Sequence, residues 1–302
     1  MSRLRRRGGH RRFFRRVRGR PVRYITILPS LVTLLNGAFG FAAIVLASKA
    51  AETDDAGGGY FAISAYMILL AMVADVLDGR LARMSQSTSS FGGQLDSLCD
   101  VISFGVAPAF LMLKLVHQQL AAEGLADGAL FQRLLLLAAL VYISCAAIRL
   151  ARFNVENVEN VSNHTSFAGL PSPAAAGVVV SLVLFQQESM PDLKVILYGL
   201  PPIAAAAGIL MVTRIPYPHV LNQYLKGKKP LSDLVKILVF LALVIADPQA
   251  TLVVIFCGFA ASFAVKAICD RLAHRQGSTA LQAESSVPDD PSQERSCPGS
   301  VG

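Results

Sequence analysis

Long runs of apolar residues constrain the fold of this chain more than any other feature, because roughly 20 apolar residues form a helix that crosses a bilayer. Only 16% of the residues are charged and 53% are hydrophobic, whereas a soluble domain carries about 25% charged residues. The apolar runs cover residues 25–48, 60–77, 97–116, 131–148, 171–186, 193–212, 233–247 and 250–268. We therefore expect an all-α, polytopic membrane helix bundle of about eight transmembrane helices, of which the fifth and seventh are the shortest.

The distribution of Lys and Arg predicts how this bundle is oriented. Eleven Arg in residues 1–23 lead into the first apolar run without a clear cleavage site, which indicates an uncleaved cytoplasmic tail and not a signal peptide. With this tail inside, eight spans place 78–96, 149–170, 213–232 and the C-terminus in the cytoplasm. These segments hold most of the remaining Lys and Arg, as the positive-inside rule requires. We expect a multi-pass protein of the cell (inner) membrane.

The two ends of the chain differ from the apolar centre. The basic segment 1–24 could bind nucleic acid through its arginines, but beside a membrane span we expect it to bind anionic lipid, at about 1 kcal/mol per basic residue. The polar, Pro- and Ser-rich segment 276–302 is typical of disorder. The five cysteines show no CxxC spacing, and we expect them to act as small buried hydrophobes. They are Cys99, Cys145, Cys257, Cys269 and Cys297.

Carboxylates gather where the second and third apolar runs meet, in DVLDGRLARMSQSTSSFGGQLDSLCD, residues 75–100. Asp75 and Asp78 are three apart and Asp96 and Asp100 are four apart, so each pair lies on one face of its helix. The Ser- and Gly-rich stretch between them is short, so we expect two antiparallel neighbouring helices. All four carboxylates can then meet at the cytoplasmic rim.

Such a cluster points to a functional site, because carboxylates at a membrane rim repel one another and are costly to remove from water. Hard divalent cations bind oxygen clusters, and Mg²⁺ pairs a few carboxylates with substrate phosphates. Zinc is disfavoured because the cluster has no His, and Cys99 points about 100° away from Asp100 on a helix.

The residues between the carboxylates complete a longer pattern. Gly79 and Ala82 leave space beside them, Arg83 offers a positive fork for phosphate, and Gly92 lets the next helix approach closely. The structural alternative is that the Asp and Arg residues of this stretch form ion pairs at the membrane interface that cap the helices. The whole pattern, Asp-x2-Asp-Gly-x2-Ala-Arg-x8-Gly-x3-Asp-x3-Asp, resembles the signature of the CDP-alcohol phosphatidyltransferases, which displace CMP from a CDP-linked lipid with an alcohol.

The resemblance implies a role for each position of the pattern. Two divalent ions, Mg²⁺ or Mn²⁺, would be held by Asp75, Asp78, Asp96 and Asp100. CDP-diacylglycerol would be bound by Gly79 and Ala82 at the cytidine, by Arg83 and the loop hydroxyl of Ser89 at the diphosphate, and by Gly92. Asp100 would also accept the proton of the attacking hydroxyl as a general base. The resemblance further implies a homodimer and a six-helix catalytic core.

Further stretches narrow the resemblance to the integral-membrane phosphatidylserine synthases of bacteria and archaea. They are SLCDVISFGVAPAF (97–110), IRLARFNV (148–155), SFAGLPSPAAAG (166–177) and MVTRIPYPH (211–219), and LPSLVTLLNGAFGF (28–41) resembles their first span. The likeness runs from about residue 25 to 225. Ser30 departs from it, because many members of the wider family carry Asn there.

A serine acceptor also fits the residues themselves. Its carboxylate needs a cation and its ammonium needs acceptors, and Arg149, Arg152 and Asn154 lie close together on one helix. The positive-inside rule alone would also place arginines there, and SFAGLPSP is equally the pattern of a Pro-broken entry to the fifth span. These two readings stay open.

The predicted activity is that of a CDP-diacylglycerol–serine O-phosphatidyltransferase, which makes phosphatidylserine and CMP. Another acceptor, glycerol 3-phosphate or inositol phosphate, is the enzymatic alternative, and a divalent-cation transporter is the non-enzymatic one. The predicted organisation is a basic tail (1–24), the catalytic membrane core (25–225), additional transmembrane helices (226–275) and a polar tail (276–302).

Overall fold

The computed structural model describes residues 24–50, 59–85, 90–122, 124, 128–159, 169–191, 193–213, 243, 246–262 and 265. Every regular element within these residues is helical. In chain order they are α1 (Tyr24–Ala50), α2 (Tyr60–Ser85), α3 (Ser90–Asp100), the π-helix η1 (Val101–Val106), α4 (Ala107–Ala122), α5 (Ala129–Glu159), α6 (Ser172–Leu184), the π-helix η2 (Phe185–Ser189) and α7 (Lys194–Val212). A shorter apolar helix covers Pro248–Ser262. The predicted all-α class is confirmed.

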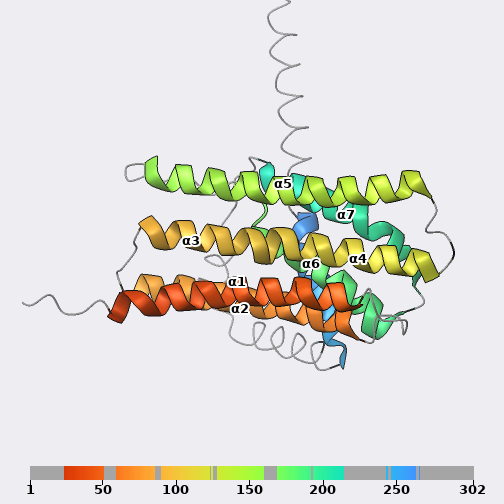
Figure 1. Ribbon diagram of the computed structural model, residues 1–302, viewed down its shortest axis with the longest axis horizontal. Helices are drawn as coiled ribbons and strands as arrows, with labels where there is room; N and C mark the ends of the chain where they lie inside the picture. The colour runs from red at the N-terminus through yellow and green to blue at the C-terminus, as the bar shows by residue number, and fades with distance from the viewer. Residues whose placement is uncertain are drawn as a thin grey trace, which may run out of the picture.

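Five helices among the described residues are long and apolar enough to cross a membrane. They are Ser30–Ala50, Tyr60–Leu81, Phe91–Ala122, Ala129–Val155 and Lys194–Val212. The third is the continuous rod of α3, η1 and α4 (Figure 1). The predicted run 171–186 corresponds to α6 and the start of η2, and 233–247 lies almost entirely outside the described residues. The expected count of eight spans therefore stays a prediction.

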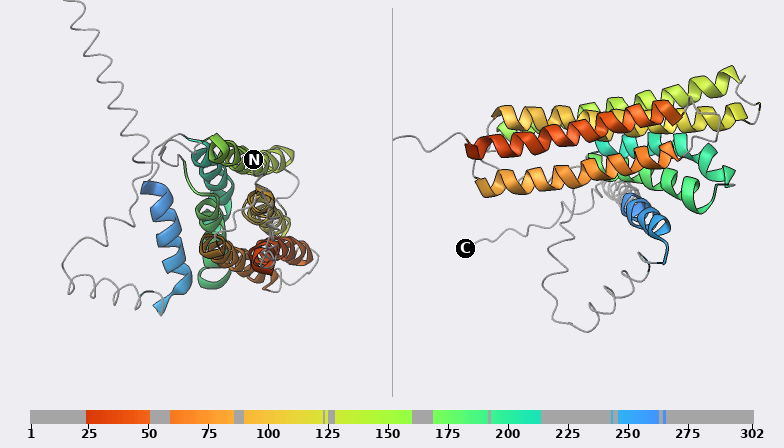
Figure 2. Two further views of the ribbon diagram at one scale, coloured as in Figure 1. Left: turned by 90° about the vertical axis from the view of Figure 1, so that its left-hand side faces the viewer. Right: turned by 60° about the horizontal axis from the view of Figure 1, so that its bottom comes forward.

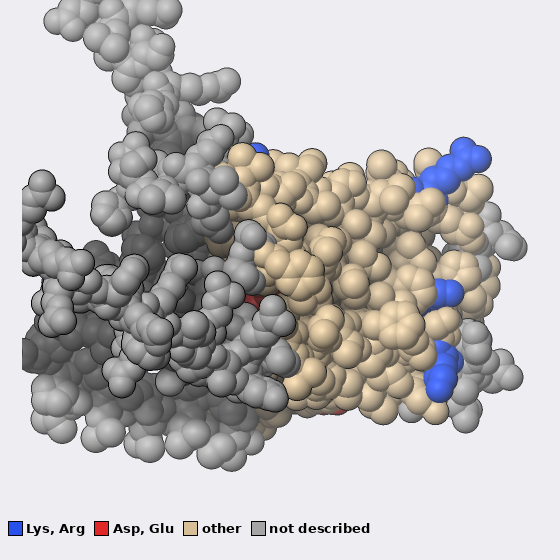
Figure 3. Space-filling view, turned by 60° about the vertical axis from the view of Figure 1, so that its left-hand side comes forward, with Lys and Arg blue, Asp and Glu red and all other residues tan. Residues whose placement is uncertain are grey.

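The long helices lie side by side along one axis (Figures 1 and 2). Large apolar side chains face outward on them, for example Leu31, Phe41 and Leu130, which are 59%, 63% and 72% exposed. In Figure 3, the described part of this face carries few charged side chains, and basic residues gather at its right-hand edge. This is the surface that a lipid-facing bundle requires, because hydrocarbon cannot solvate charge.

The helix α1 packs against both α2 and the α3–η1–α4 rod, whereas α2 meets that rod mainly through α4. The second and third spans, which carry the two Asp pairs, are therefore neighbours as expected, but they meet mainly through α4 and η1, and α1 lies against both α2 and α3. The buried face of α1 explains the arrangement, because its residues are small or polar at spacings of three and four: Thr33, Asn36, Gly40, Ala43, Ala47 and Ala50. Small residues let helix backbones approach closely in a membrane.

Three cysteines fall among the described residues, and all three are free thiols. Cys99 is buried, while Cys145 and Cys257 are half-buried. The prediction of small buried side chains holds fully for Cys99 and in part for the other two. Cys269 and Cys297 lie outside the described residues.

Candidate active site

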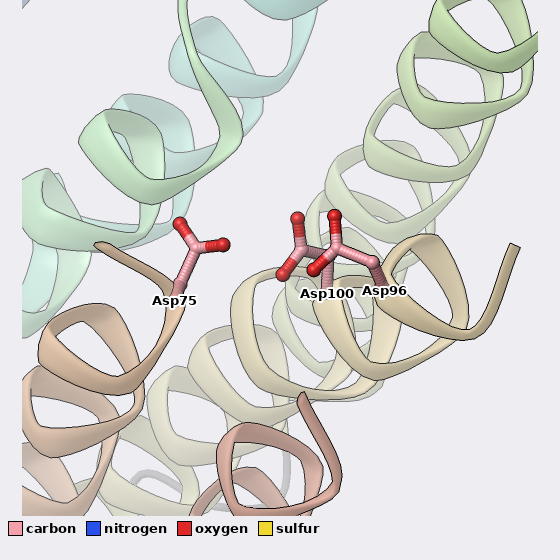
Figure 4. A group of neighbouring side chains, drawn as sticks. All are labelled: Asp75, Asp96 and Asp100. Carbon is pink, nitrogen blue, oxygen red and sulfur yellow. The ribbon is translucent and has the colours of Figure 1, made fainter. Parts of the chain in front are cut away.

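Three carboxylates from two helices converge near one end of the bundle. Asp75 projects from α2, and Asp96 and Asp100 project one turn apart from α3 toward it (Figure 4). One carboxylate oxygen from each lies within 4.8 Å of the others. Asp100 is buried, while Asp75 and Asp96 are half-buried. The structure thus brings together three of the four carboxylates that the sequence predicts to meet.

Asp78 lies beside this group but contacts a different helix. Its side chain is buried, and one of its oxygens accepts a hydrogen bond from the hydroxyl of Thr33 on α1. Its negative charge still acts on Asp75 and Asp96. Asp78 is therefore part of the same electrostatic site, with its orientation set by α1.

The donor set fits hard divalent cations. Within the described residues, no hydrogen bond or ion pair reaches the carboxylates of Asp75 or Asp96, and the cation that acts on Asp100 is Arg149. Carboxylates this close repel one another unless a positive charge lies between them. Oxygen ligands in this number are what Mg²⁺ and Mn²⁺ prefer.

The surroundings of Asp100 are fixed by hydrogen bonds. The Asn36 side-chain amide of α1 donates to Asp100 Oδ1 over 2.9 Å. The π-helix η1 begins at the next residue, and π-helical turns are frequent at functional sites. Two hydroxyls hold this turn: Ser103 donates to the backbone carbonyl of Asn36 over 2.9 Å, and buried Tyr142 donates to the Phe104 carbonyl over 3.0 Å.

The three predicted serine-binding residues have different partners. Arg149 Nη1 donates to Ser172 Oγ at the start of α6 over 3.0 Å, and its buried Nε has no hydrogen-bond partner among the described residues. Arg152 Nη1 instead donates over 3.2 Å to the carbonyl of Val212, the last residue of α7. Asn154 Oδ1 accepts a hydrogen bond of 2.9 Å from Ser97. Of the three, Arg149 has an unused donor and a charge that acts on the carboxylates.

The predicted CDP-diacylglycerol residues are described only in part. Gly79 is exposed on α2, and a Cβ added there would meet nothing within 4 Å, so there is open space beside the carboxylates. Gly92 is half-buried on α3. Ser89 and the side chains of Ala82 and Arg83 lie outside the described part of the chain, so their roles stay predictions.

Sequence reasoning missed Thr33 and Asn36, which contact two of the four aspartates. The signal was present, because both are polar residues inside an apolar run and their spacing of three places them on one helical face. Ser103 and Tyr142 gave no comparable signal, because hydroxyls often bond to the backbone of their own helix.

Comparison with known proteins gives consistent matches. Residues 26–216 match the family model described as CDP-alcohol phosphatidyltransferase. A CDP-diacylglycerol–serine O-phosphatidyltransferase of Helicobacter pylori (strain J99 / ATCC 700824) is 32% identical over 235 residues, which cover 77% of this chain and 87% of the relative.

Two archaeal relatives show similar identity. The protein of the same name in Methanocaldococcus jannaschii is 33% identical over 203 residues, covering 67% of this chain and 79% of the relative. An archaetidylserine synthase of Methanothermobacter thermautotrophicus is 32% identical over 197 residues, which cover 64% of this chain and 70% of the relative. The family-model match, residues 26–216, includes the whole carboxylate cluster from Asp75 to Asp100.

Proposed function

This chain belongs to the CDP-alcohol phosphatidyltransferase family, and we propose that it transfers the phosphatidyl group of CDP-diacylglycerol to L-serine, giving phosphatidylserine and CMP. The observation that carries the proposal is the convergence of Asp75, Asp96 and Asp100 within 4.8 Å, on the residues of the family pattern. Relatives at 32–33% identity whose names give serine as the acceptor or as part of the product support the choice of acceptor.

The carboxylates Asp75, Asp96 and Asp100, with Asp78 beside them, would hold two divalent ions. When bound, Mg²⁺ or Mn²⁺ supplies positive charge that stabilises the diphosphate and the departing CMP. The open space at Gly79 suits the cytidine. We assign Arg83 and Ser89 to the diphosphate, and Gly92 as a further residue of the CDP-diacylglycerol site.

Asp100 is proposed as the general base. The serine hydroxyl oxygen forms a bond to the phosphorus that carries diacylglycerol, the bond from that phosphorus to the CMP oxygen breaks, and the hydroxyl proton passes to the Asp100 carboxylate. A positioned base of this kind contributes about 10²–10⁴-fold to the rate. Asn36 engages Oδ1 of Asp100, which leaves its second oxygen to meet ligands.

Arg149 is the residue we assign to the serine carboxylate. Its Nε is buried without a partner among the described residues, and Nη1 is held by Ser172. An arginine fixed in this way presents its remaining donors in a rigid fork that matches a carboxylate. Arg152 already donates a hydrogen bond to α7, and Asn154 already accepts one from α3. We therefore assign both a supporting role around the serine acceptor.

The alternatives are less well supported. Glycerol 3-phosphate or inositol phosphate would need a stronger cationic pocket, and Arg149 is the described cation whose charge acts on the cluster. A cation transporter would need acidic residues along several spans. In the sequence of α1 through α4, however, every acidic residue is one of the four clustered aspartates.

We further propose the setting of the reaction. The active site would face the cytoplasm at the inner membrane of the cell, the basic segment 1–24 would bind anionic lipids, and the protein would act as a homodimer. Five apolar helices of spanning length support the multi-pass part of this proposal.

The test is CMP release from CDP-diacylglycerol by the detergent-solubilised full chain, with serine, glycerol 3-phosphate and inositol phosphate as separate acceptors. We expect release with serine, loss of release in EDTA and recovery on adding Mg²⁺ or Mn²⁺. Preference for a phosphorylated acceptor would refute the assignment of serine. Full turnover in the chelator would refute the metal site.

A further inference from the structure

Helix α1 carries two polar side chains that contact the aspartates but take no direct part in the reaction described above. Thr33 is 3% exposed and Asn36 is fully buried, within a run of otherwise apolar or small residues. Polar groups in this setting are costly unless they are hydrogen-bonded. Their three-residue spacing puts both on the buried face of α1, toward α2 and α3.

Each of the two contacts a different aspartate on a different helix. The Thr33 hydroxyl donates to Asp78 of α2, and the Asn36 amide donates to Asp100 of α3 over 2.9 Å. Because α2 and α3 pack on α1 more than on each other, α1 is the element that sets the relative position of the two carboxylates.

The position of the Asn36 amide is itself fixed. Its backbone carbonyl accepts the hydroxyl of Ser103, and Gly40 one turn later lies against the backbone of Ser103. Only the NH₂ end of the amide can face a carboxylate, because the amide oxygen would repel it. The Oδ1 atom of Asn36 is consequently buried without a hydrogen-bond partner among the described residues. Since an apolar side chain would leave no such atom, packing alone does not account for asparagine here.

We propose that Asn36 and Thr33 are positioning residues, which fix the carboxylates of Asp100 and Asp78 in the orientation that binds the divalent ions. They act through the aspartates and do not touch the substrates. The inference rests on the proposed function for its link to catalysis, but its central claim concerns metal affinity. Residues that orient metal-binding carboxylates in this way typically change affinity or activity 10–100-fold when replaced.

The test uses the full chain in detergent and Mn²⁺ alone as the probe, with no lipid or serine present. Asn36→Leu keeps the approximate size and removes both the donor and the unpartnered oxygen. We expect its Mn²⁺ dissociation constant, measured by electron paramagnetic resonance, to rise about 10–100-fold. We expect the melting temperature of the metal-free protein to stay the same or rise. Ser64→Ala is the matched control, because buried Ser64 of α2 also bonds α1, at the Ala43 carbonyl over 2.7 Å, away from the carboxylates.

The outcomes separate positioning from structure. Unchanged Mn²⁺ affinity in Asn36→Leu, or an equal loss in Ser64→Ala, overturns the proposal. If Asn36→Leu does not fold, variants of Thr33 test the proposal instead. Thr33→Val should bind Mn²⁺ more weakly than the wild type, whereas Thr33→Ser, which keeps the hydroxyl, should bind it as the wild type does. Equal Mn²⁺ affinity of Thr33→Val and Thr33→Ser overturns the proposal. A wild-type enzyme that prefers another alcohol refutes the serine assignment and leaves the Mn²⁺ result intact. A wild-type chain that binds no Mn²⁺ refutes both.

Discussion

Replacing Gly40 by alanine should damage the active site through backbone packing alone. A Cβ at Gly40 would lie 2.7 Å from Ser103 Cα and 3.0 Å from Ser103 Cβ. Carbon atoms in contact normally lie about 3.5–4.0 Å apart, so α1 and η1 must separate by about 1 Å. A rotamer change cannot relieve this contact because the Cα atom belongs to the backbone.

The same displacement reaches the carboxylates. Asn36 lies one turn before Gly40, and its 2.9 Å bonds to Asp100 and from Ser103 would lengthen by about the same amount, beyond the usual limit of about 3.2 Å. Overpacking costs about 1–3 kcal/mol, which the better helix propensity of alanine offsets by about 0.5–1 kcal/mol. A misplacement of about 1 Å near a reacting group can cost about 10²-fold in rate.

The assay is kcat for CMP release together with thermal unfolding in detergent. We expect Gly40→Ala to lose about 10²-fold in kcat, with a modest fall in melting temperature. Gly199→Ala in α7 is the control, because its Cβ would meet Ile203 Cδ1 at an ordinary 3.6 Å, and it should keep wild-type activity. Wild-type kcat and stability in Gly40→Ala would refute the argument that the α1–η1 contact positions Asp100.

Three further predictions test individual roles. Asp100→Asn should lower kcat about 10²–10⁴-fold even at saturating Mn²⁺, whereas Asp96→Asn should recover in part as Mn²⁺ is raised; equal recovery in a metal titration would remove Asp100 as the base. Arg149→Ala should raise the KM for serine roughly tenfold to a hundredfold, because a charge-assisted hydrogen bond contributes about 1.5–3 kcal/mol. Arg152→Ala should chiefly lower the melting temperature. If Arg149→Ala and Arg152→Ala raise the KM for serine equally, the assignment of the serine carboxylate to Arg149 alone is contradicted. Gly79→Ala should melt as the wild type does, since its Cβ meets open space, but raise the KM for CDP-diacylglycerol; an unchanged KM would place the cytidine elsewhere.

The sequence predicts the helices and the carboxylate cluster because both follow from local spacing. Apolar runs of spanning length become helices, and Asp96 and Asp100 share a face because they are four residues apart. Spacing does not reveal which neighbouring helix a face meets. The sequence therefore predicts that the second and third spans are neighbours, but it does not show that α1 lies against both α2 and α3. The π-helical turn after Asp100 has no local sequence signal, because it depends on partners such as Tyr142 from α5.

The two arginines show the same limit. Arg149 and Arg152 are three residues apart on α5 and are equivalent by composition, charge and expected face. One helical turn nevertheless changes the neighbour: Arg149 reaches Ser172 at the start of α6, while Arg152 reaches the last carbonyl of α7. Only the contacts that the two arginines make with α6 and α7 distinguish a residue with an unused buried donor from one that satisfies a helix terminus.

The arrangement of α1 explains why a pattern confined to residues 75–100 is not sufficient to form the site. Its two halves lie on helices that pack mainly on a third, so the distance between Asp75 and the Asp96–Asp100 pair depends on how both contact α1. Small residues make that contact close: a Cβ at Gly37 would lie 3.0 Å from the sulfur of Cys99, next to Asp100. Donors on the same face then orient one carboxylate from each helix. Repulsion among the carboxylates would otherwise drive α2 and α3 apart, so divalent cations bound at the cluster would stabilise the same geometry as α1 does. A substitution on α1 should therefore weaken cation binding, and removal of the cations should weaken the packing of α2 and α3 on α1.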